Sequence, residues 1–269
     1  MLPHVDGYTL LGSTGEAPSL TLAARREITE AALAMTPRDK AVIVGVSSTC
    51  LEDTVSLARH AQDHGCAGVL CAAPYYFANT NDGILRFLAQ LDAALNVDLC
   101  FYDNPQATKT LLAAGAISGW AQELEHLTSV KLTDHDLSKI DAWHAAGLTV
   151  LAGDDPIIFR YLAAGVDGAI VIAPAVFPEP FRRTYDLARA GDTSAAFEIF
   201  AREILPFVHV FGIGDEIATT KALLAAVGIF ASSQVLPPLL PATEARTELL
   251  RRAYDLGLAA RDSRVRQAT

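Results

Sequence analysis

Short apolar runs alternate with stretches of helical periodicity along most of this chain. The runs are rich in β-branched residues and read, in order, "YTLL", "AVIVGV", "GVLCAA", "VDLCFY", "LTSVK", "LTVLA" and "GAIVI". Near-continuous apolar strands that alternate with helices are typical of a parallel sheet covered by helices on both faces. We therefore expect an α/β protein with parallel strands near residues 8–11, 41–46, 68–72, 98–102, 128–131, 149–152 and 168–172.

Polar residues follow nearly every expected strand, as happens when the loops at one end of a barrel converge on one face. No GxGxxG follows a strand, which disfavours an open dinucleotide-binding sheet. We expect a TIM-type parallel (β/α) barrel in residues 1–191 as the catalytic domain, and a C-terminal helical segment in residues 192–269. The expected helices are 22–35, 51–64, 82–94, 138–146, 155–164, 194–208, 216–227 and 242–256.

Composition excludes several classes of function. The 21 basic and 31 acidic residues give a formal net charge of −10, which is unsuited to nucleic acid. The chain has no uninterrupted apolar stretch of membrane-spanning length and no secretory signal, so we expect a cytoplasmic protein without nucleic-acid or membrane partners. Cys71 and Cys100 lie in apolar runs and are expected to be buried thiols. The seven histidines show no ligand spacing backed by carboxylates, so we expect no metal site.

Lys131 is the only one of five lysines that ends an apolar strand, "LTSVK". An amine at the mouth of a barrel can act as a nucleophile toward ketones, although a strand-end lysine can also simply reach solvent. Tyr102 ends the preceding strand and could relay protons beside it. Ser13 and Thr14 stand between two glycines before an expected helix, which suits either an anion site or an ordinary turn.

These residues lie in motifs that resemble one known family. The fragments "VDGYTLLGSTGE", "APYYF", "FYDNP", "SVKLTD", "AGDD" and "PPLLP" are similar to the pyruvate-dependent class I aldolases, which include N-acetylneuraminate lyase and dihydrodipicolinate synthase. The resemblance implies that Lys131 forms a Schiff base with pyruvate and that Tyr102 relays protons. It implies no metal or organic cofactor, because the imine on Lys131 itself withdraws electrons.

The resemblance also implies a binding site and an assembly. Ser13 and Thr14 would hold the pyruvate carboxylate in a loop shaped by Gly12 and Gly15, and the Ile170 carbonyl would lie near the pyruvyl group. Tyr76 resembles a catalytic-site tyrosine that reaches into the neighbouring subunit, so we expect a homodimer or homotetramer, although Tyr76 could serve only in packing.

Three departures from the family pattern affect the expected reaction. The first strand and helix of the pattern are absent, which accounts for seven strands where a (β/α) barrel normally has eight. Ala107 stands where the synthases carry an arginine for the second substrate's carboxylate. Thr133 resembles a threonine of the lyase and sugar-acid aldolase branch, and Asp154 or Asp155 could contact the same substrate or cap the next helix.

We therefore expect a carbon–carbon lyase, a Schiff-base pyruvate-dependent aldolase that acts on a 2-keto-3-deoxy sugar acid or an N-acetylneuraminate-like substrate. One alternative is dihydrodipicolinate synthase, also called 4-hydroxy-tetrahydrodipicolinate synthase. Another is a non-catalytic relative that binds ketoacids, which the absent first βα unit suggests.

Overall fold

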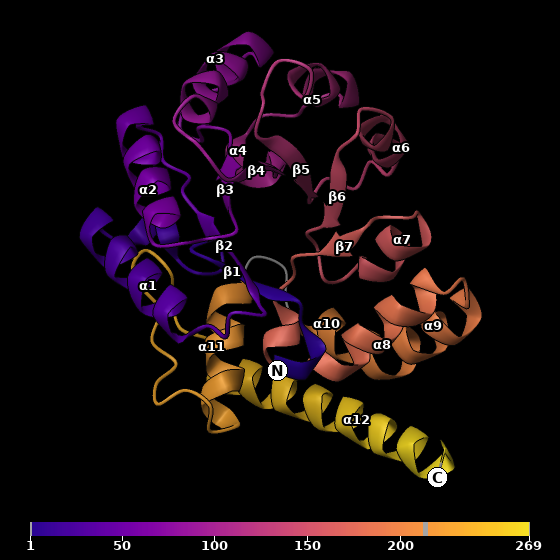
Figure 1. The fold of residues 1–269 in the computed structure, drawn as a ribbon. Helices are drawn as coiled ribbons and strands as arrows, with labels where there is room; N and C mark the ends of the chain where they lie inside the picture. The colour runs from indigo at the N-terminus through magenta and orange to yellow at the C-terminus, as the bar shows by residue number, and fades with distance from the viewer. Residues whose placement is uncertain (1, 212–214, 269) are drawn as a thin grey trace. The chain divides into compact units, whose positions relative to one another are not determined.

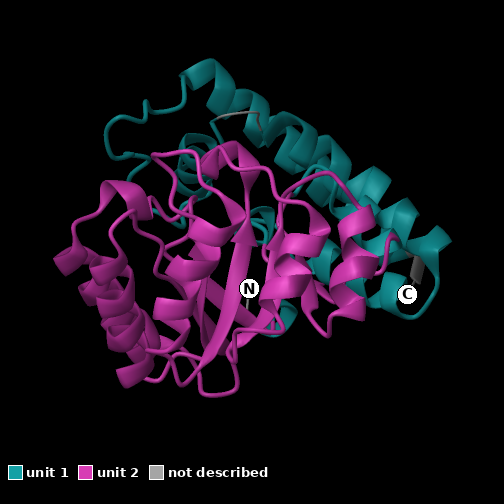
Figure 2. Cartoon of the chain, turned by 90° about the horizontal axis from the view of Figure 1, so that it is seen from above, with its two compact units in different colours: residues 1–5, 155–163, 171–269 teal, residues 6–154, 164–170 magenta. Residues whose placement is uncertain are grey.

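The computed structural model describes residues 2–211 and 215–268. The chain forms two compact units, which Figure 2 colours separately. Unit 2 contains residues 6–154 and 164–170, whereas unit 1 contains residues 1–5, 155–163 and 171–269. The expected division of the chain near residue 191 stays a prediction.

Unit 2 is built on one parallel sheet whose strands pair in chain order, and they follow an arc in Figure 1. The parallel order and the strand positions confirm the expected class of sheet. Among the described residues no ladder joins the last strand to the first, so the sheet is curled but open. The strands are β1 (Gly7–Leu10), β2 (Ala41–Gly45), β3 (Gly68–Ala72), β4 (Asp98–Asp103), β5 (Leu127–Leu132), β6 (Thr149–Ala152) and β7 (Gly168–Ala169).

Apolar side chains on the strands and helices form the core of unit 2. Val69, Leu99, Val130 and Val150 are fully buried, as the apolar runs predict. The helices are α1 (Leu22–Met35), α2 (Leu51–Asp63), α3 (Asn81–Asp92), α4 (Pro105–Thr108), α5 (Ala114–Trp120) and α6 (Ser138–Ala145), with a 3-10 turn η2 (Ala17–Ser19) before α1.

Unit 1 is helical. Its long final helix is held near its end by Arg264, which bonds Glu203 at 2.6 Å and Glu179 at 2.9 Å. The expected C-terminal helical segment is confirmed, and the final helix runs past the expected residue 256 to residue 268. The elements are η1 (Leu2–His4), α7 (Ile158–Ala163), η3 (Ala173–Ala175), α8 (Pro178–Arg189), α9 (Thr193–Ile199), the π-helix η4 (Phe200–Ile204), α10 (Leu205–Phe211), α11 (Glu216–Ala226) and α12 (Glu244–Ala268).

Two details differ from the expectation. The expected strand 168–172 ends at Ala169, because Ile172 is already in the right-handed helical region and Pro174 lies in η3. Helices α4, α5 and α8 had no counterpart among the expected helices. In the part of the chain that the structure describes, no helix combines the length and apolarity needed to span a membrane.

Candidate active site

Lys131 and Tyr102 face each other across neighbouring strands. The register pairs Tyr102 on β4 with Lys131 on β5, so the two side chains project from the same side of the sheet. The Nζ atom of Lys131 lies 4.2 Å from the centroid of the Tyr102 ring. Tyr102 is buried and Lys131 is half-buried. The expected neighbourhood of amine and phenol is therefore present, although the role of each group stays a prediction.

Several polar groups converge on the phenol of Tyr102. The Asn104 Nδ2 atom donates a hydrogen bond to the phenol oxygen at 3.0 Å. Burial alone raises the pKa of Tyr102, but the positive charge of Lys131 and hydrogen bonding from neighbouring side chains outweigh burial and leave the pKa lowered. Thr133 lies close enough to the phenol to help lower the pKa of Tyr102. Its shielded hydroxyl nevertheless forms no well-directed hydrogen bond with the described residues.

Asn104 was missed in the sequence, yet it has two functions at this strand end. Besides bonding Tyr102, its side-chain oxygen accepts a hydrogen bond from the Ala107 N–H at 3.1 Å and so caps α4. Pro105 occupies the first position of that helix, which is a favoured place for proline. The "NP" pair in "FYDNP" was therefore an available signal for a helix start, and the cap orients Asn104 beside the phenol.

Gly153, directly after β6, provides space for the amine. A Cβ atom at Gly153 would lie 2.6 Å from the Thr133 Oγ1 atom and 2.9 Å from the Lys131 Cε atom. It would also lie 3.0 Å from the Leu132 carbonyl oxygen, so backbone as well as side chain would have to move. Only glycine lets the end of β6 approach the Lys131 stem this closely.

A second lysine lies behind this site and was not expected to be buried. Lys139, at the start of α6, is only 2% exposed and bonds Asp103 at 2.8 Å and Asp134 at 2.5 Å. Burial opposes the charge of Lys139, but hydrogen bonds to the two carboxylates leave its pKa raised. Asp103 follows Tyr102 and Asp134 follows Thr133, so the triad fixes the ends of β4 and β5 that carry the site.

The loop with Ser13 and Thr14 differs from the expected helix N-terminus. Both residues are exposed in a turn that leads into η2, and α1 starts at Leu22, where the sequence predicts it. The reason is local, since the Thr21 side chain accepts the Ala24 N–H and caps α1 there. Ser13 and Thr14 therefore lie in a turn before η2 rather than at the first turn of α1, and their expected role in holding a carboxylate stays a prediction.

Hydrogen bonds within the turn hold the Ser13–Thr14 loop. The Gly15 N–H donates to the Gly12 carbonyl at 3.1 Å, and the Glu16 N–H donates to the Ser13 carbonyl at 3.1 Å. Gly12 has open space around it, whereas a Cβ at Gly15 would lie 3.2 Å from the Leu11 backbone. Gly15 therefore has a steric role in the loop that Gly12 lacks.

The two aspartates of "AGDD" have different partners. Asp154 in unit 2 lies 2.8 Å from the Nε2 atom of His135, which follows the "KLTD" motif. Asp155 is buried and its carboxylate accepts the N–H groups of Ile172 at 3.1 Å and Ala173 at 2.8 Å. Asp155 thus caps the first residue of η3, while Asp154 is the aspartate that shares unit 2 with Lys131.

Ile170 and Tyr76 occupy strand-end loops of unit 2. The Ile170 N–H donates to the Ala152 carbonyl at 2.8 Å, which continues the β6–β7 ladder by one residue. Tyr76 follows β3 and is 81% exposed, next to Phe77 at 76%. Their rings form an edge-to-face pair with centroids 5.1 Å apart. The positions fit the expected roles without testing them.

The expected burial of the Cys71 and Cys100 thiols is confirmed. Burial raises the pKa of Cys71 to about 12 and the pKa of Cys100 to about 11. A thiol with so high a pKa remains protonated at neutral pH and is a poor nucleophile. Lys131 therefore has no thiol competitor among these core residues.

Comparison with known proteins identifies the family. The model of the dihydrodipicolinate synthetase family matches residues 3–255. The 4-hydroxy-tetrahydrodipicolinate synthase of Methanocaldococcus jannaschii is 28% identical over 256 residues, covering 94% of this chain and 88% of the relative. The Salinibacter ruber protein of the same name is 29% identical over 243 residues, covering 89% and 80%.

Solved structures support the same family assignment. A crystal structure of a dihydrodipicolinate synthase superposes with a TM-score of 0.90 at 27% identity, covering 96% of this chain and 90% of the other. YagE, a prophage protein of E. coli from the dihydrodipicolinic acid synthase family, was solved in complex with pyruvate and superposes with a TM-score of 0.86 at 25% identity, covering 94% and 87%. The chain therefore belongs to the dihydrodipicolinate synthetase family of pyruvate-dependent class I aldolases and is an enzyme of the carbon–carbon lyase type.

Proposed function

We propose that this enzyme binds pyruvate as an imine on Lys131 and makes or breaks a carbon–carbon bond at the pyruvate methyl carbon. The observation that carries the proposal is the pairing of Lys131 with Tyr102, with the amine 4.2 Å from the ring centroid. No described carboxylate forms an ion pair with Lys131, so its nitrogen is available for attack on a ketone.

The proposed chemistry needs an amine and a proton relay. Nζ attacks the C2 carbonyl of pyruvate, water leaves, and a positively charged imine forms. Loss of a proton from C3 sends its electron pair toward nitrogen and gives a neutral enamine, which attacks the carbonyl of the second substrate. In the reverse direction, breaking the bond to C3 yields the same enamine. Tyr102, held by Asn104, would transfer the protons, and its lowered pKa suits that role.

The pyruvate carboxylate is proposed to bind at the Ser13–Thr14 turn. Both hydroxyls are exposed and Gly12 leaves open space beside them. Hydroxyls and N–H groups in a turn donate to carboxylates without help from a helix dipole. The Ile170 carbonyl would lie near the pyruvyl group at the end of β7. No metal or organic cofactor enters the proposal.

The relatives support synthesis of 4-hydroxy-tetrahydrodipicolinate as the reaction. The relatives from Methanocaldococcus jannaschii and Salinibacter ruber have that name, and this chain matches most of the length of each. This support favours the alternative stated from the sequence over its main prediction of a sugar-acid or N-acetylneuraminate-like substrate. In this reaction the enamine would add to an aldehyde that carries its own carboxylate.

One specific observation favours cleavage of a sugar acid as a second candidate. Ala107 is exposed in α4 and has only a methyl group where the synthases carry an arginine. A methyl group cannot form the bidentate pair that an arginine makes with a carboxylate. Thr133 and Asp154 follow neighbouring strands and offer polar groups for substrate hydroxyls, whereas the Asp155 carboxylate already accepts the N–H groups of Ile172 and Ala173.

The test combines trapping with a substrate comparison. Borohydride reduction in the presence of pyruvate should add a pyruvyl group to the peptide that contains Lys131, as mass spectrometry reports. An adduct on another lysine, or none, would overturn the mechanism and favour a non-catalytic ketoacid binder. Enzyme that has not been treated with borohydride is assayed separately for condensation of pyruvate with aspartate semialdehyde, and for pyruvate release from 2-keto-3-deoxy sugar acids and N-acetylneuraminate. The faster reaction identifies the second substrate.

The proposal includes assembly through the loop that contains Tyr76 and Phe77. Two adjacent aromatic side chains exposed at 81% and 76% are unfavourable in water and suited to an interface. A homodimer or homotetramer would cover them and bring Tyr76 toward a neighbouring active site. Light scattering at micromolar concentration should give the mass of a dimer or tetramer, and a monomeric mass would contradict the assembly.

We also propose that the barrel lacks the first βα unit of the family pattern. The open order from β1 to β7 supports this. A crystal structure of the assembled protein should show the gap between β1 and β7 either exposed or covered by another segment or partner chain. A further parallel strand of this chain between β1 and β7 would contradict the proposal.

A further inference from the structure

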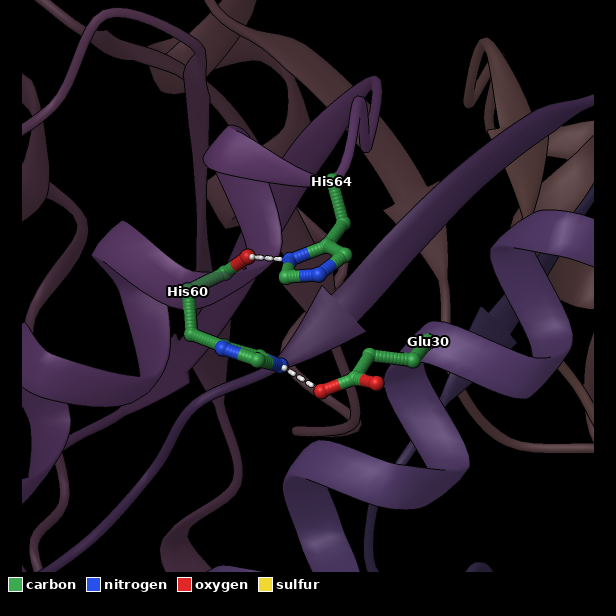
Figure 3. Close-up of side chains that lie close together, drawn as sticks. All are labelled: Glu30, His60 and His64. Carbon is green, nitrogen blue, oxygen red and sulfur yellow. Dashed lines mark hydrogen bonds and ion pairs between the residues drawn. The ribbon is translucent and has the colours of Figure 1, made fainter.

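Glu30, His60 and His64 lie together on the helices α1 and α2 (Figure 3). Glu30 comes from α1, while the histidines are four residues apart at the end of α2, so they share one helix face. The His60 Nε2 atom lies 3.2 Å from a Glu30 carboxylate oxygen. The potential ligand atoms of all three residues lie within 4.8 Å of one another. Two imidazoles and a carboxylate in this arrangement are a familiar ligand set for zinc.

The orientation of His64 leaves one ring nitrogen ready to bind a cation. Its Nδ1 atom lies 2.8 Å from the His60 carbonyl oxygen. A carbonyl can only accept a hydrogen bond, so Nδ1 carries the proton and Nε2 of the neutral ring keeps its lone pair. Metal-binding histidines are commonly held by such a hydrogen bond from the second ring nitrogen, which sets both the tautomer and the ring orientation.

His60 supplies an independent observation. Its Nε2 atom is shielded from solvent and lies 3.2 Å from the Glu30 carboxylate, in an ion-pair contact that lacks the geometry of a hydrogen bond. A shielded polar atom that forms no hydrogen bond is costly. The rings of His60 and His64 lie with their centroids only 4.3 Å apart. A cation between the rings and the carboxylate would satisfy Nε2 and offset the charge of Glu30.

We propose that Glu30, His60 and His64 form a site for Zn²⁺ or a similar borderline transition-metal ion that links α1 to α2. Two imidazole nitrogens favour such ions over Mg²⁺ and Ca²⁺, which prefer oxygen ligands. Three protein ligands leave the fourth tetrahedral position to water, in keeping with the exposure of Glu30 and His64. Small side-chain rotations would bring the three ligand atoms to bonding distance.

The site is separate from the candidate active site. Helix α2 runs back from the carboxyl end of β2 to the amino end of β3, so the residues at its end lie toward the opposite edge of the sheet from Lys131. We therefore expect the metal to stabilise the packing of α1 on α2 and to leave the formation of the pyruvate imine unchanged. The proposal does not depend on the enzyme's substrate.

The test uses the full chain, stripped of metal with a chelator and titrated with Zn²⁺. Calorimetry and metal analysis should show one bound ion per chain, and Zn²⁺ should raise the melting temperature. His64→Ala and Glu30→Gln, both at exposed positions, should weaken binding at least about tenfold and remove the rise in melting temperature. Excess Mg²⁺ should not compete.

His144→Ala is the matched control. His144 also lies near a carboxylate, 2.9 Å from Asp167, with its side chain 34% exposed, but it belongs to no three-ligand cluster in the described residues. This variant should bind Zn²⁺ as the wild type does. The proposal is overturned if the wild type binds no stoichiometric Zn²⁺, or if binding survives in both cluster variants. Equal losses in the control and cluster variants would also overturn it, because they would show diffuse surface binding.

Discussion

Two lysines, eight positions apart in the chain, have opposite environments in unit 2. Lys131 is half-buried at the end of β5 and faces the ring of Tyr102, with no described carboxylate as ion-pair partner. Lys139 is 2% exposed and bonds two carboxylates, Asp103 and Asp134. A nucleophilic amine must be able to lose its proton, whereas a buried structural amine must keep its charge balanced. The number and kind of partners, rather than burial alone, distinguish the two.

The comparison also shows how one amine supports the other. Asp103 and Asp134 directly follow Tyr102, which faces the Lys131 amine, and Thr133, which lies two residues after Lys131. In addition, the Thr133 N–H donates to the Asp103 carbonyl at 3.0 Å. The ion pairs of Lys139 therefore fix the ends of β4 and β5, and these strand ends position Tyr102 and Lys131.

The largest effect is expected from Lys131→Arg. Arginine keeps a positive charge beside Tyr102 but does not deprotonate, so it cannot form an imine. Borohydride reduction with pyruvate should give no adduct, and turnover should fall to background. Lys109→Met is the control, because Lys109 is exposed and its Nζ atom donates a hydrogen bond to the Gln106 carbonyl. Persistent trapping in Lys131→Arg would assign the imine to another residue.

Tyr102→Phe should lower turnover by about 10²- to 10⁴-fold, which is the usual contribution of a general acid–base group. Pyruvate should still be trapped on Lys131, because the ring and the amine remain. Steady-state kinetics and borohydride trapping, measured on separate aliquots of one preparation, distinguish proton transfer from imine formation. Tyr185→Phe in unit 1 serves as the control. A loss of turnover smaller than about tenfold would show that Tyr102 is not the group that transfers the proton.

Lys139→Met should destabilise the fold by about 3–5 kcal/mol, because it leaves buried carboxylate charge unpaired. Urea unfolding measures the loss. Adding Asp103→Asn, which removes the charge of a side chain that is 1% exposed, should recover a large part of the stability. If Lys139→Met alone is neutral, the triad does not hold the strand ends. An additive double variant would show that Lys139 and Asp103 do not interact.

The smallest effect concerns the titration of Tyr102. Its pKa is lowered from the ordinary 10.0, and the charge of Lys131 is the largest lowering influence, acting against burial. Lys131→Met should therefore move the phenol pKa upward. Difference absorbance titrations against the matching Tyr102→Phe variants isolate this one tyrosine. An unchanged pKa would show that Lys131 does not act on the phenol.

The lowered pKa of Tyr102 also makes the stability of the fold depend on pH. Because the folded chain releases the Tyr102 proton more readily than the unfolded chain, this group favours folding at pH above 10 and the contribution is lost as the pH falls through the lowered folded pKa. Unfolding measured across this range should show the contribution in the wild type and lose it in Tyr102→Phe. Equal pH dependence of the two proteins would contradict the shift.

Strand positions and strand-end residues could be predicted from the chain because they follow from local patterns. Apolar runs located all seven strands to within a few residues, and position alone placed Lys131 and Tyr102 at neighbouring strand ends. Helix α1 was also located, since Thr21 is a capping residue before an amphipathic stretch. The start of η2 was not, because it depends on left-handed backbone at Glu16.

The partners of charged side chains could not be predicted in the same way. Lys139 reads as an ordinary helix residue until the register of β4 and β5 brings Asp103 and Asp134 to it. His60 and His64 show only a helical spacing, and Glu30, thirty residues before His60, becomes their neighbour when α1 packs on α2. Local periodicity is set by bonding between residues that are close in the sequence, so it can be predicted from the sequence. Contacts between distant segments depend on strand register and helix packing, and the tertiary structure alone supplies these.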